Sequence, residues 1–165
     1  MPGTLILGLG NPLMGDDGVG VAAVGKLREA WELPADVTVV DGGTWGMNLL
    51  PLIESAGRLI LVDAIDTGAA PGTLTVLERH ELPKLFVLKL SPHQIDLREV
   101  LALAEWRGAL PAYLVAVGVQ PRRVEMDLAL SPEVAAALGK LVDLVVDRLE
   151  SAGHRCRRRE AAVGA

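Results

Sequence analysis

The chain has little cysteine and few aromatic residues. Cys156 is the single cysteine among 165 residues, which excludes an internal disulfide bond and a cysteine-based zinc site. Aromatic residues make up 3% of the chain and hydrophobic residues 50%, so the core must consist largely of aliphatic side chains. Such a core suits parallel β-strands that helices cover on both faces.

The chain also lacks an excess of positive charge and any long apolar segment. A net charge of −5 argues against general nucleic-acid binding, which needs a basic surface. No apolar stretch reaches membrane-spanning length, and no signal-like segment precedes the first predicted strand. We therefore expect a soluble, cytoplasmic monomer with no nucleic-acid or membrane partner. Its length predicts one domain over residues 1–153 and a flexible basic tail over residues 154–165.

Residues 5–20, LILGLGNPLMGDDGVG, join an apolar strand, a glycine-rich turn and two adjacent acids. This order is typical of the start of a ligand crevice in an open α/β sheet. A dinucleotide fingerprint is not met, because the third glycine of G-x-G-x-x-G would fall at Leu13. Carboxylates at a helix start would also repel a pyrophosphate. The turn therefore suits a cation or a polar group.

Strand and helix patterns alternate along the rest of the chain. The strands are expected over residues 4–9, 37–40, 59–62, 73–79 and 113–119. This alternation predicts a three-layer α/β fold, with a mostly parallel twisted sheet, helices on both faces, and residues 73–79 as an antiparallel edge strand.

Helix boundaries are marked by capping residues and prolines. The first helix is expected to end at Leu33-Pro34, and the last to run from Ser131-Pro132 to Gly153. One helix either begins near Asn48 or kinks at Pro51. The helix over residues 100–104 begins either at Ser91-Pro92 or near Asp96.

Three acids follow predicted parallel strands: Asp17, Asp41 and Asp63. Parallel strands present their carboxyl ends at one edge of the sheet, so these acids should converge, and His93 at the head of a later helix could join them. Asp17 could instead cap a helix, Asp41 form a turn and His93 lie in a loop. Asp63 is harder to explain structurally, because a carboxylate at the end of an apolar strand is costly without a partner.

Together these residues would make a ligand set for nickel, zinc, iron or manganese. Other chemistries are poorly supported. No G-x-S-x-G motif surrounds any serine, so a hydrolase nucleophile elbow is absent. Cys156 lies in the basic tail, where an incidental thiol is expected, and we interpret His80 as structural.

Six motifs in order resemble those of the hydrogenase maturation proteases, endopeptidases that trim the C-terminus of the [NiFe]-hydrogenase large subunit after nickel insertion. They are GLGNPLMGDDGVG, DGGTWGMNLL, LILVDAID, PGTL, LSPHQIDL and VAVGVQP. The resemblance implies that Asp17, Asp63 and His93 are the metal-binding and catalytic residues. It also implies that the DGG segment, Asp41, Gly42 and Gly43, handles the substrate.

The resemblance further implies that nickel is carried by the large-subunit precursor and is not a permanent cofactor of the protease. Asp17, Asp63 and His93 would complete its coordination, so that nickel marks a precursor as ready for cutting. Two hypotheses remain for catalysis. Asp17 or Asp63 activates water while the metal polarises the scissile carbonyl, or the three ligands only anchor nickel and Asp41 performs the acid–base chemistry.

Two alternative functions share some of these sequence features. Peptidyl-tRNA hydrolase also begins with a strand and GLGNP, but it needs a histidine shortly afterwards, and this chain has none before His80. A non-enzymatic metal- or nucleotide-binding module is the second alternative. Leu13 disfavours nucleotide binding, and a nickel carrier would need more than three histidines and one thiol.

Overall fold

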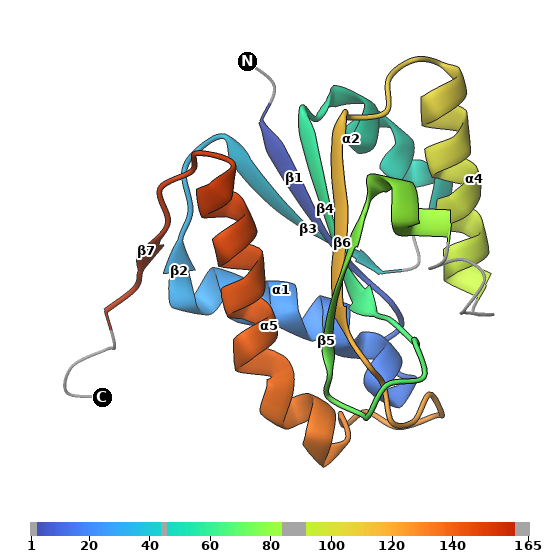
Figure 1. The fold of residues 1–165 in the computed structure, drawn as a ribbon, viewed down its shortest axis with the longest axis vertical. Helices are drawn as coiled ribbons and strands as arrows, with labels where there is room; N and C mark the ends of the chain where they lie inside the picture. The colour runs from blue at the N-terminus through green and yellow to red at the C-terminus, as the bar shows by residue number, and fades with distance from the viewer. Residues whose placement is uncertain (1–2, 44–45, 84–91, 161–165) are drawn as a thin grey trace.

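The computed structural model describes residues 3–43, 46–83 and 92–160, and for residues 92–96 the backbone alone. A five-stranded sheet in the order β3-β1-β4-β6-β5 forms its centre (Figure 1). The four parallel strands are β1 (Thr4–Leu9), β3 (Val37–Gly43), β4 (Arg58–Ala64) and β6 (Tyr113–Val119). The remaining strand, β5 (Leu74–Glu78), pairs antiparallel with β6 at the edge, as predicted.

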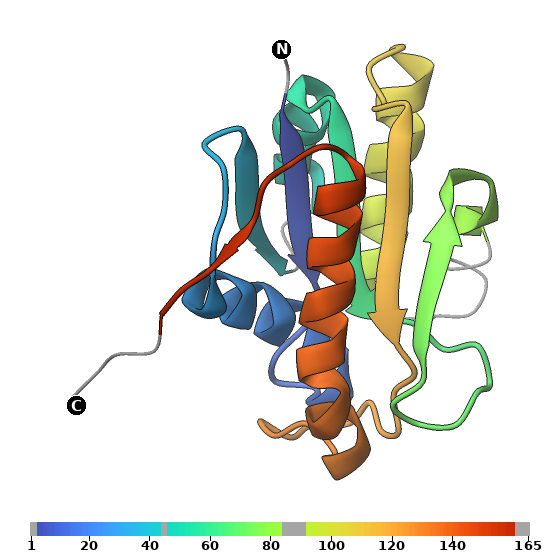
Figure 2. The same cartoon turned by 60° about the vertical axis from the view of Figure 1, so that its left-hand side comes forward.

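Helices cover both faces of this sheet (Figure 2). On one face α1 (Val19–Ala30) and α5 (Pro132–Ser151) pack on an aliphatic cluster that includes Ile6, Val62 and Val117. On the other face α2 (Leu50–Ser55) and α4 (Pro92–Trp106) pack on a second cluster that includes Leu7 and Leu61. Neighbouring residues of one strand enter opposite clusters, because side chains alternate between the faces of a strand. The predicted three-layer α/β fold is confirmed.

The central strands are buried on both faces. All six residues of β1 are buried, and so is every residue of β4 and β6 after the first. Continuous burial explains why these segments are apolar without alternation. The predicted boundaries of β1 and β6 are those observed, whereas β3 and β4 extend beyond the predicted residues 40 and 62.

In the described part of the chain, short 3₁₀ helices connect these elements: η1 (Gly15–Gly18), η2 (Gly46–Leu49) and η3 (Arg79–Glu81). Because η2 leads directly into α2, Pro51 lies in the first turn of α2, which agrees with the first of the two alternatives for this helix. Helix α4 begins at Pro92, as the Ser91-Pro92 alternative predicts, although Ser91 itself lies outside the described residues. Of the helices that the structure describes, none has the length and apolarity needed to cross a membrane.

The C-terminal segment differs from the predicted tail over residues 154–165. His154 is buried, and its Nε2 lies 2.7 Å from the Thr4 hydroxyl oxygen. The short strand β7 (Arg157–Arg158) pairs antiparallel with β2 (Trp31–Glu32), so residues up to Arg159 pack against the domain. Helix α1 accordingly ends at Ala30 and not at Pro34, because Trp31 and Glu32 are extended to pair with β7. Residues 161–165 lie outside the described part of the chain.

Candidate active site

Gly10 brings two of the predicted site residues, Asp17 and Asp63, close together. Its φ of 107° is in the left-handed region that favours glycine. A Cβ atom at this position would lie 1.8 Å from the Asp17 carbonyl oxygen and 3.4 Å from Asp63 Oδ1. The backbone of Asp17 and the carboxylate of Asp63 therefore both border Gly10, at the carboxyl end of the parallel sheet.

Asp63 is the second-last residue of β4 and is 1% exposed. Its Oδ1 accepts a hydrogen bond from the Ala64 backbone N–H at 2.8 Å. The carboxylate is thus held at the end of an apolar strand, where the sequence placed it. A polar group at this depth is tolerated only when it is hydrogen-bonded.

Asp17 lies in η1 and is 2% exposed. Its Oδ2 accepts a hydrogen bond from the Asn11 backbone N–H at 2.9 Å, and the Asn11 side chain accepts one from the Leu13 N–H. The two contacts fold the GNPL turn around the carboxylate. Close packing of α1 on the sheet supports this turn, since a Cβ at Gly20 would lie 2.1 Å from the Val62 carbonyl oxygen.

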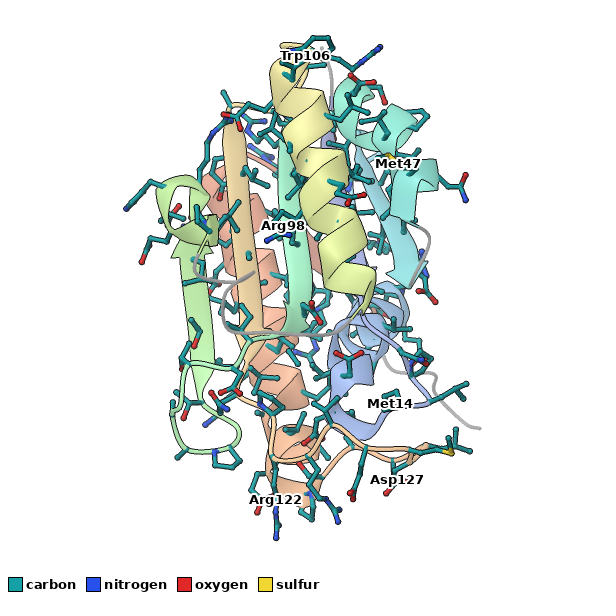
Figure 3. The ribbon with its side chains drawn as sticks, turned by 90° about the vertical axis from the view of Figure 1, so that its right-hand side faces the viewer. Met14, Met47, Arg98, Trp106, Arg122 and Asp127 are labelled. Carbon is teal, nitrogen blue, oxygen red and sulfur yellow. The ribbon has the colours of Figure 1, made fainter. Side chains whose placement is uncertain are left out.

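The third predicted ligand, His93, lies in the first turn of α4, and its side chain is outside the described residues. That turn lies at the carboxyl end of the sheet, on the side of the molecule where Met14 lies (Figure 3). Among the side chains that the structure describes, no group of three His, Cys, Asp or Glu residues could hold a metal ion. The structure places Asp17 and Asp63 next to Gly10, and the role of His93 stays a prediction.

The DGG segment forms the end of β3 and lies beside the glycine-rich turn. Asp41 pairs with Gly8, Gly43 pairs with Leu9 after a register shift, and the Gly10 N–H donates to the Gly43 carbonyl at 3.4 Å. Asp41 is exposed, whereas Gly42 is buried. The segment thus shares the carboxyl edge with Asp17 and Asp63, and its carboxylate faces solvent.

Asp16, the acid before Asp17, has no role in the predictions from sequence, yet its carboxylate is bound to a distant part of the chain. It is 1% exposed, and its carboxylate accepts hydrogen bonds from Arg122 N–H, Arg123 N–H, Ser131 N–H and Ser131 Oγ–H at 2.7 to 3.0 Å. Burial acts to raise the pKa of this carboxyl, but these four hydrogen bonds outweigh it, so the pKa lies below its usual value of 3.8. Asp16 ties η1 to the segment between β6 and α5.

Gln120 is a second residue that sequence reasoning missed. Its side chain is buried, accepts a hydrogen bond from Thr67 N–H at 2.8 Å and donates one to Asp66 Oδ1 at 2.9 Å. It fixes the chain that leaves β4 just after Asp63. Neither Asp16 nor Gln120 carries a local sequence signal, because Thr67, Asp66 and the Asp16 partners named above lie at least 53 residues away from them.

A sizeable cavity lies away from these residues. It has a volume of about 750 Å³, and its described lining includes Arg79, Arg98 and Leu114 but not Asp17, Asp41 or Asp63. Leu114 precedes Gly118, the β6 partner of Asp63, by four residues, or about 13 Å along a strand. The candidate site is therefore the acidic turn at the carboxyl edge of the sheet and not this cavity.

The fold and the site define an α/β protein with two buried carboxylates at the carboxyl edge of a parallel sheet. Carboxylates in this position can serve as metal ligands or as general bases. The family model described as hydrogenase maturation protease, HycI, matches residues 21–148. The chain belongs to the hydrogenase maturation protease family, and it is accordingly a peptidase.

Relatives in sequence support this assignment over the full length. Hydrogenase 2 maturation protease of Escherichia coli strain K12 is 39% identical over 158 residues, which cover 95% of this chain and 96% of the relative. The hydrogenase expression/formation protein HupD of Thiocapsa roseopersicina is 39% identical over 163 residues, covering 96% of this chain and 73% of that protein.

Solved structures agree. The hydrogenase maturating endopeptidase HybD from Escherichia coli superposes with a TM-score of 0.91 at 38% identity, covering 95% of this chain and 98% of that one. The [NiFe] hydrogenase maturation protease HybD from Thermococcus kodakarensis has a TM-score of 0.70 at 27% identity, covering 88% and 98%. The family assignment sets aside the peptidyl-tRNA hydrolase and the non-enzymatic binding module as alternatives.

Proposed function

We propose that this peptidase removes the C-terminal extension of a [NiFe]-hydrogenase large-subunit precursor after nickel has been inserted. The observation that carries the proposal is that Asp17 and Asp63, both nearly fully buried, border the same glycine, Gly10, in a chain of this family. A substrate without a metal ion would not explain two buried acids at this edge of the sheet. A precursor that carries its own cation would explain them.

Nickel belongs to the substrate in this proposal. Carboxylate oxygens and an imidazole nitrogen are suitable ligands for Ni²⁺, so Asp17, Asp63 and His93 would complete the coordination of an ion already seated in the precursor. Only a nickel-bearing precursor would gain this coordination energy. The difference in affinity between loaded and empty precursors would prevent premature cutting.

Two roles for the acids are compatible with this docking. In the first, Asp17 or Asp63 accepts a proton from the attacking water while nickel polarises the scissile carbonyl. In the second, the buried acids and His93 only hold nickel, and the exposed carboxylate of Asp41, which faces solvent beside the same turn, is the base. The depth of Asp17 and Asp63 favours the holding role, and the exposure of Asp41 favours its access to water.

The test compares the wild type with Asp17→Asn, Asp63→Asn, Asp41→Asn and His93→Gln. Each protein is incubated with nickel-loaded and nickel-free precursor, and cleavage is scored by mass spectrometry. The wild type should cut only the loaded precursor. Substitution of the general base should allow the complex with the precursor to form but stop cleavage. Substitution of a residue that only coordinates nickel should weaken binding of the precursor. Normal cleavage by all four variants would exclude both roles.

We further infer that the protein acts in the cytoplasm, as a monomer, on a protein partner and not on nucleic acid or a membrane. The net charge of −5 supports the absence of a nucleic-acid partner. Sedimentation at micromolar concentration tests the oligomeric state, and a dimer would contradict this inference.

A further inference from the structure

Large apolar side chains are exposed mainly at one end of the molecule. In the described part of the chain they are Leu13 at 57%, Met47 at 49%, Trp106 at 85%, Val124 at 46%, Met126 at 87% and Leu128 at 81%. Four of the six belong to the turn after β1 and to the segment between β6 and α5. We call these four, Leu13, Val124, Met126 and Leu128, the apolar rim.

Backbone hydrogen bonds make the two segments of the apolar rim a single surface. The Asp127 N–H donates to the Leu13 carbonyl at 3.0 Å, and the Gly15 N–H donates to the Asp127 carbonyl at 2.8 Å. Met14 and Asp127 accordingly form a parallel β-bridge. Figure 3 shows Met14, Asp127 and Arg122 together at one end of the molecule and Trp106 at the opposite end.

The buried carboxylate of Asp16 fixes the segment that carries Val124, Met126 and Leu128 of the apolar rim. That carboxylate anchors Arg122, Arg123 and Ser131, which flank the exposed residues on both sides. With its two ends fixed, the segment exposes residues 124, 126 and 128 together. An apolar surface that is ordered before binding loses little entropy when a partner covers it.

The charged residues around the apolar rim are held by local contacts, which are ion pairs for the two arginines and a backbone hydrogen bond for Asp127. Arg122 contacts Glu133 at 2.8 Å and Arg123 contacts Glu125 at 3.5 Å, while Asp127 accepts a hydrogen bond from Ala129 N–H at 2.9 Å. The surface therefore offers neither a basic patch for an anionic polymer nor a long-range attraction for a membrane. Contiguous exposed apolar groups of this kind mark surfaces that bind another protein.

The apolar rim is also continuous with the candidate active site. Asp16 is followed directly by Asp17, and Leu13 donates its N–H to the same Asn11 whose N–H binds Asp17. We propose that the folded body of the large-subunit precursor docks on Leu13, Val124, Met126 and Leu128 through an apolar surface of its own, which seats its nickel between Asp17 and Asp63. The inference rests on the proposed function and names the surface that recognises the protein substrate.

The test measures KM and kcat for cleavage of the nickel-loaded precursor by Met126→Asp and Leu128→Asp. Both side chains are more than four-fifths exposed, so the variants should fold. Each should raise KM about tenfold, since truncating a central interface residue commonly costs this much affinity. The value of kcat should stay within about twofold, because the catalytic residues are untouched. Trp106→Asp, at 85% exposure on the opposite end, is the matched control and should leave both constants unchanged.

A second measurement uses the wild type alone. Hydroxyl-radical labelling should show that bound nickel-loaded precursor protects Met126 and Leu128 but not Trp106. If the wild type cleaves the precursor while both variants retain its KM and no protection is seen, the docking surface is wrong and the proposed function stands. If the wild type binds through the apolar rim but never cleaves, the proposed function is wrong and the surface stands. The inference is overturned if the precursor is neither bound nor cleaved, or if a second copy of this chain covers the apolar rim.

Discussion

Asp16 and Ser131 are joined by two hydrogen bonds, one from the Ser131 N–H to Oδ1 at 2.7 Å and one from its hydroxyl to Oδ2 at 2.8 Å. The two residues are 115 positions apart in the chain. Ser131 immediately precedes α5, and Asp16 immediately precedes Asp17. The start of the last helix and the candidate active site are therefore held by one carboxylate.

We expect Asp16→Ala to destabilise the protein by about 3 kcal/mol, because buried and part-buried donors lose a charged hydrogen-bond acceptor. These donors belong to Arg122, Arg123 and Ser131. Urea unfolding followed by circular dichroism measures the change. Asp143→Ala, at an exposed position of α5, is the control and should change stability by less than about 0.5 kcal/mol. Equal effects of the two variants would contradict the role given to Asp16.

The same carboxyl predicts a dependence of stability on pH. Its pKa is lower in the folded protein than the usual 3.8, because its hydrogen bonds outweigh burial. A depressed folded-state pKa contributes stability that is fully present above the unfolded pKa and is lost as the pH falls through the folded pKa. The difference in unfolding free energy between wild type and Asp16→Asn should therefore be constant near neutral pH and shrink below about pH 4. A difference that grows on acidification would refute this assignment.

Gly10→Ala should abolish cleavage. The new Cβ would lie 1.8 Å from the Asp17 carbonyl oxygen, and the backbone would keep a φ that side chains disfavour, so the turn between the two acids must move. Cleavage of the nickel-loaded precursor, scored by mass spectrometry, measures the loss. Gly25→Ala in α1 is the matched control, since nothing lies within 4 Å of its Cβ position. That variant should remain active and gain roughly 0.5–1 kcal/mol of stability, as expected for a helix interior.

Cys156 should react slowly with iodoacetamide near neutral pH. Burial of the thiol, with a smaller contribution from nearby Glu150, raises its pKa above the usual 9.0, and the thiolate is the reactive form. Alkylation followed by mass spectrometry should be slower in the folded protein than in urea, and Cys156→Ser should cleave the precursor normally. Loss of activity in that variant would give the thiol a function that the structure does not indicate.

The sheet could be predicted from local patterns because its central strands are buried on both faces. Residues 4–9 and 113–119 are continuous apolar runs, and they form β1 and β6 with the predicted boundaries. The edge strand over residues 74–78 was recognisable from its partial alternation. The prediction that the first helix continues to Pro34 is wrong at Trp31, which lies in β2. Its partner in β7 is more than 120 residues further along the chain, so no local pattern indicates this pairing.

The sequence predicted the acids of the candidate site, while the position of the histidine side chain is untested. Asp17, Asp41 and Asp63 were identified because each follows an apolar strand, and the structure places all three at one edge of the sheet. The side chain of His93 lies outside the described residues, so its place among the ligands remains a prediction.

What the amino-acid sequence determined by itself was the local information: which segments are strands and helices, where glycine permits a tight turn, and which acids follow a strand. The three-dimensional packing added that Asp16 supports the segment between β6 and α5, and that the C-terminal segment pairs with β2. The physical reason is that a hydrogen bond depends on the distance between two atoms in space. For Asp16 and Ser131, or Thr4 and His154, more than a hundred residues of chain separate groups that lie within 3 Å.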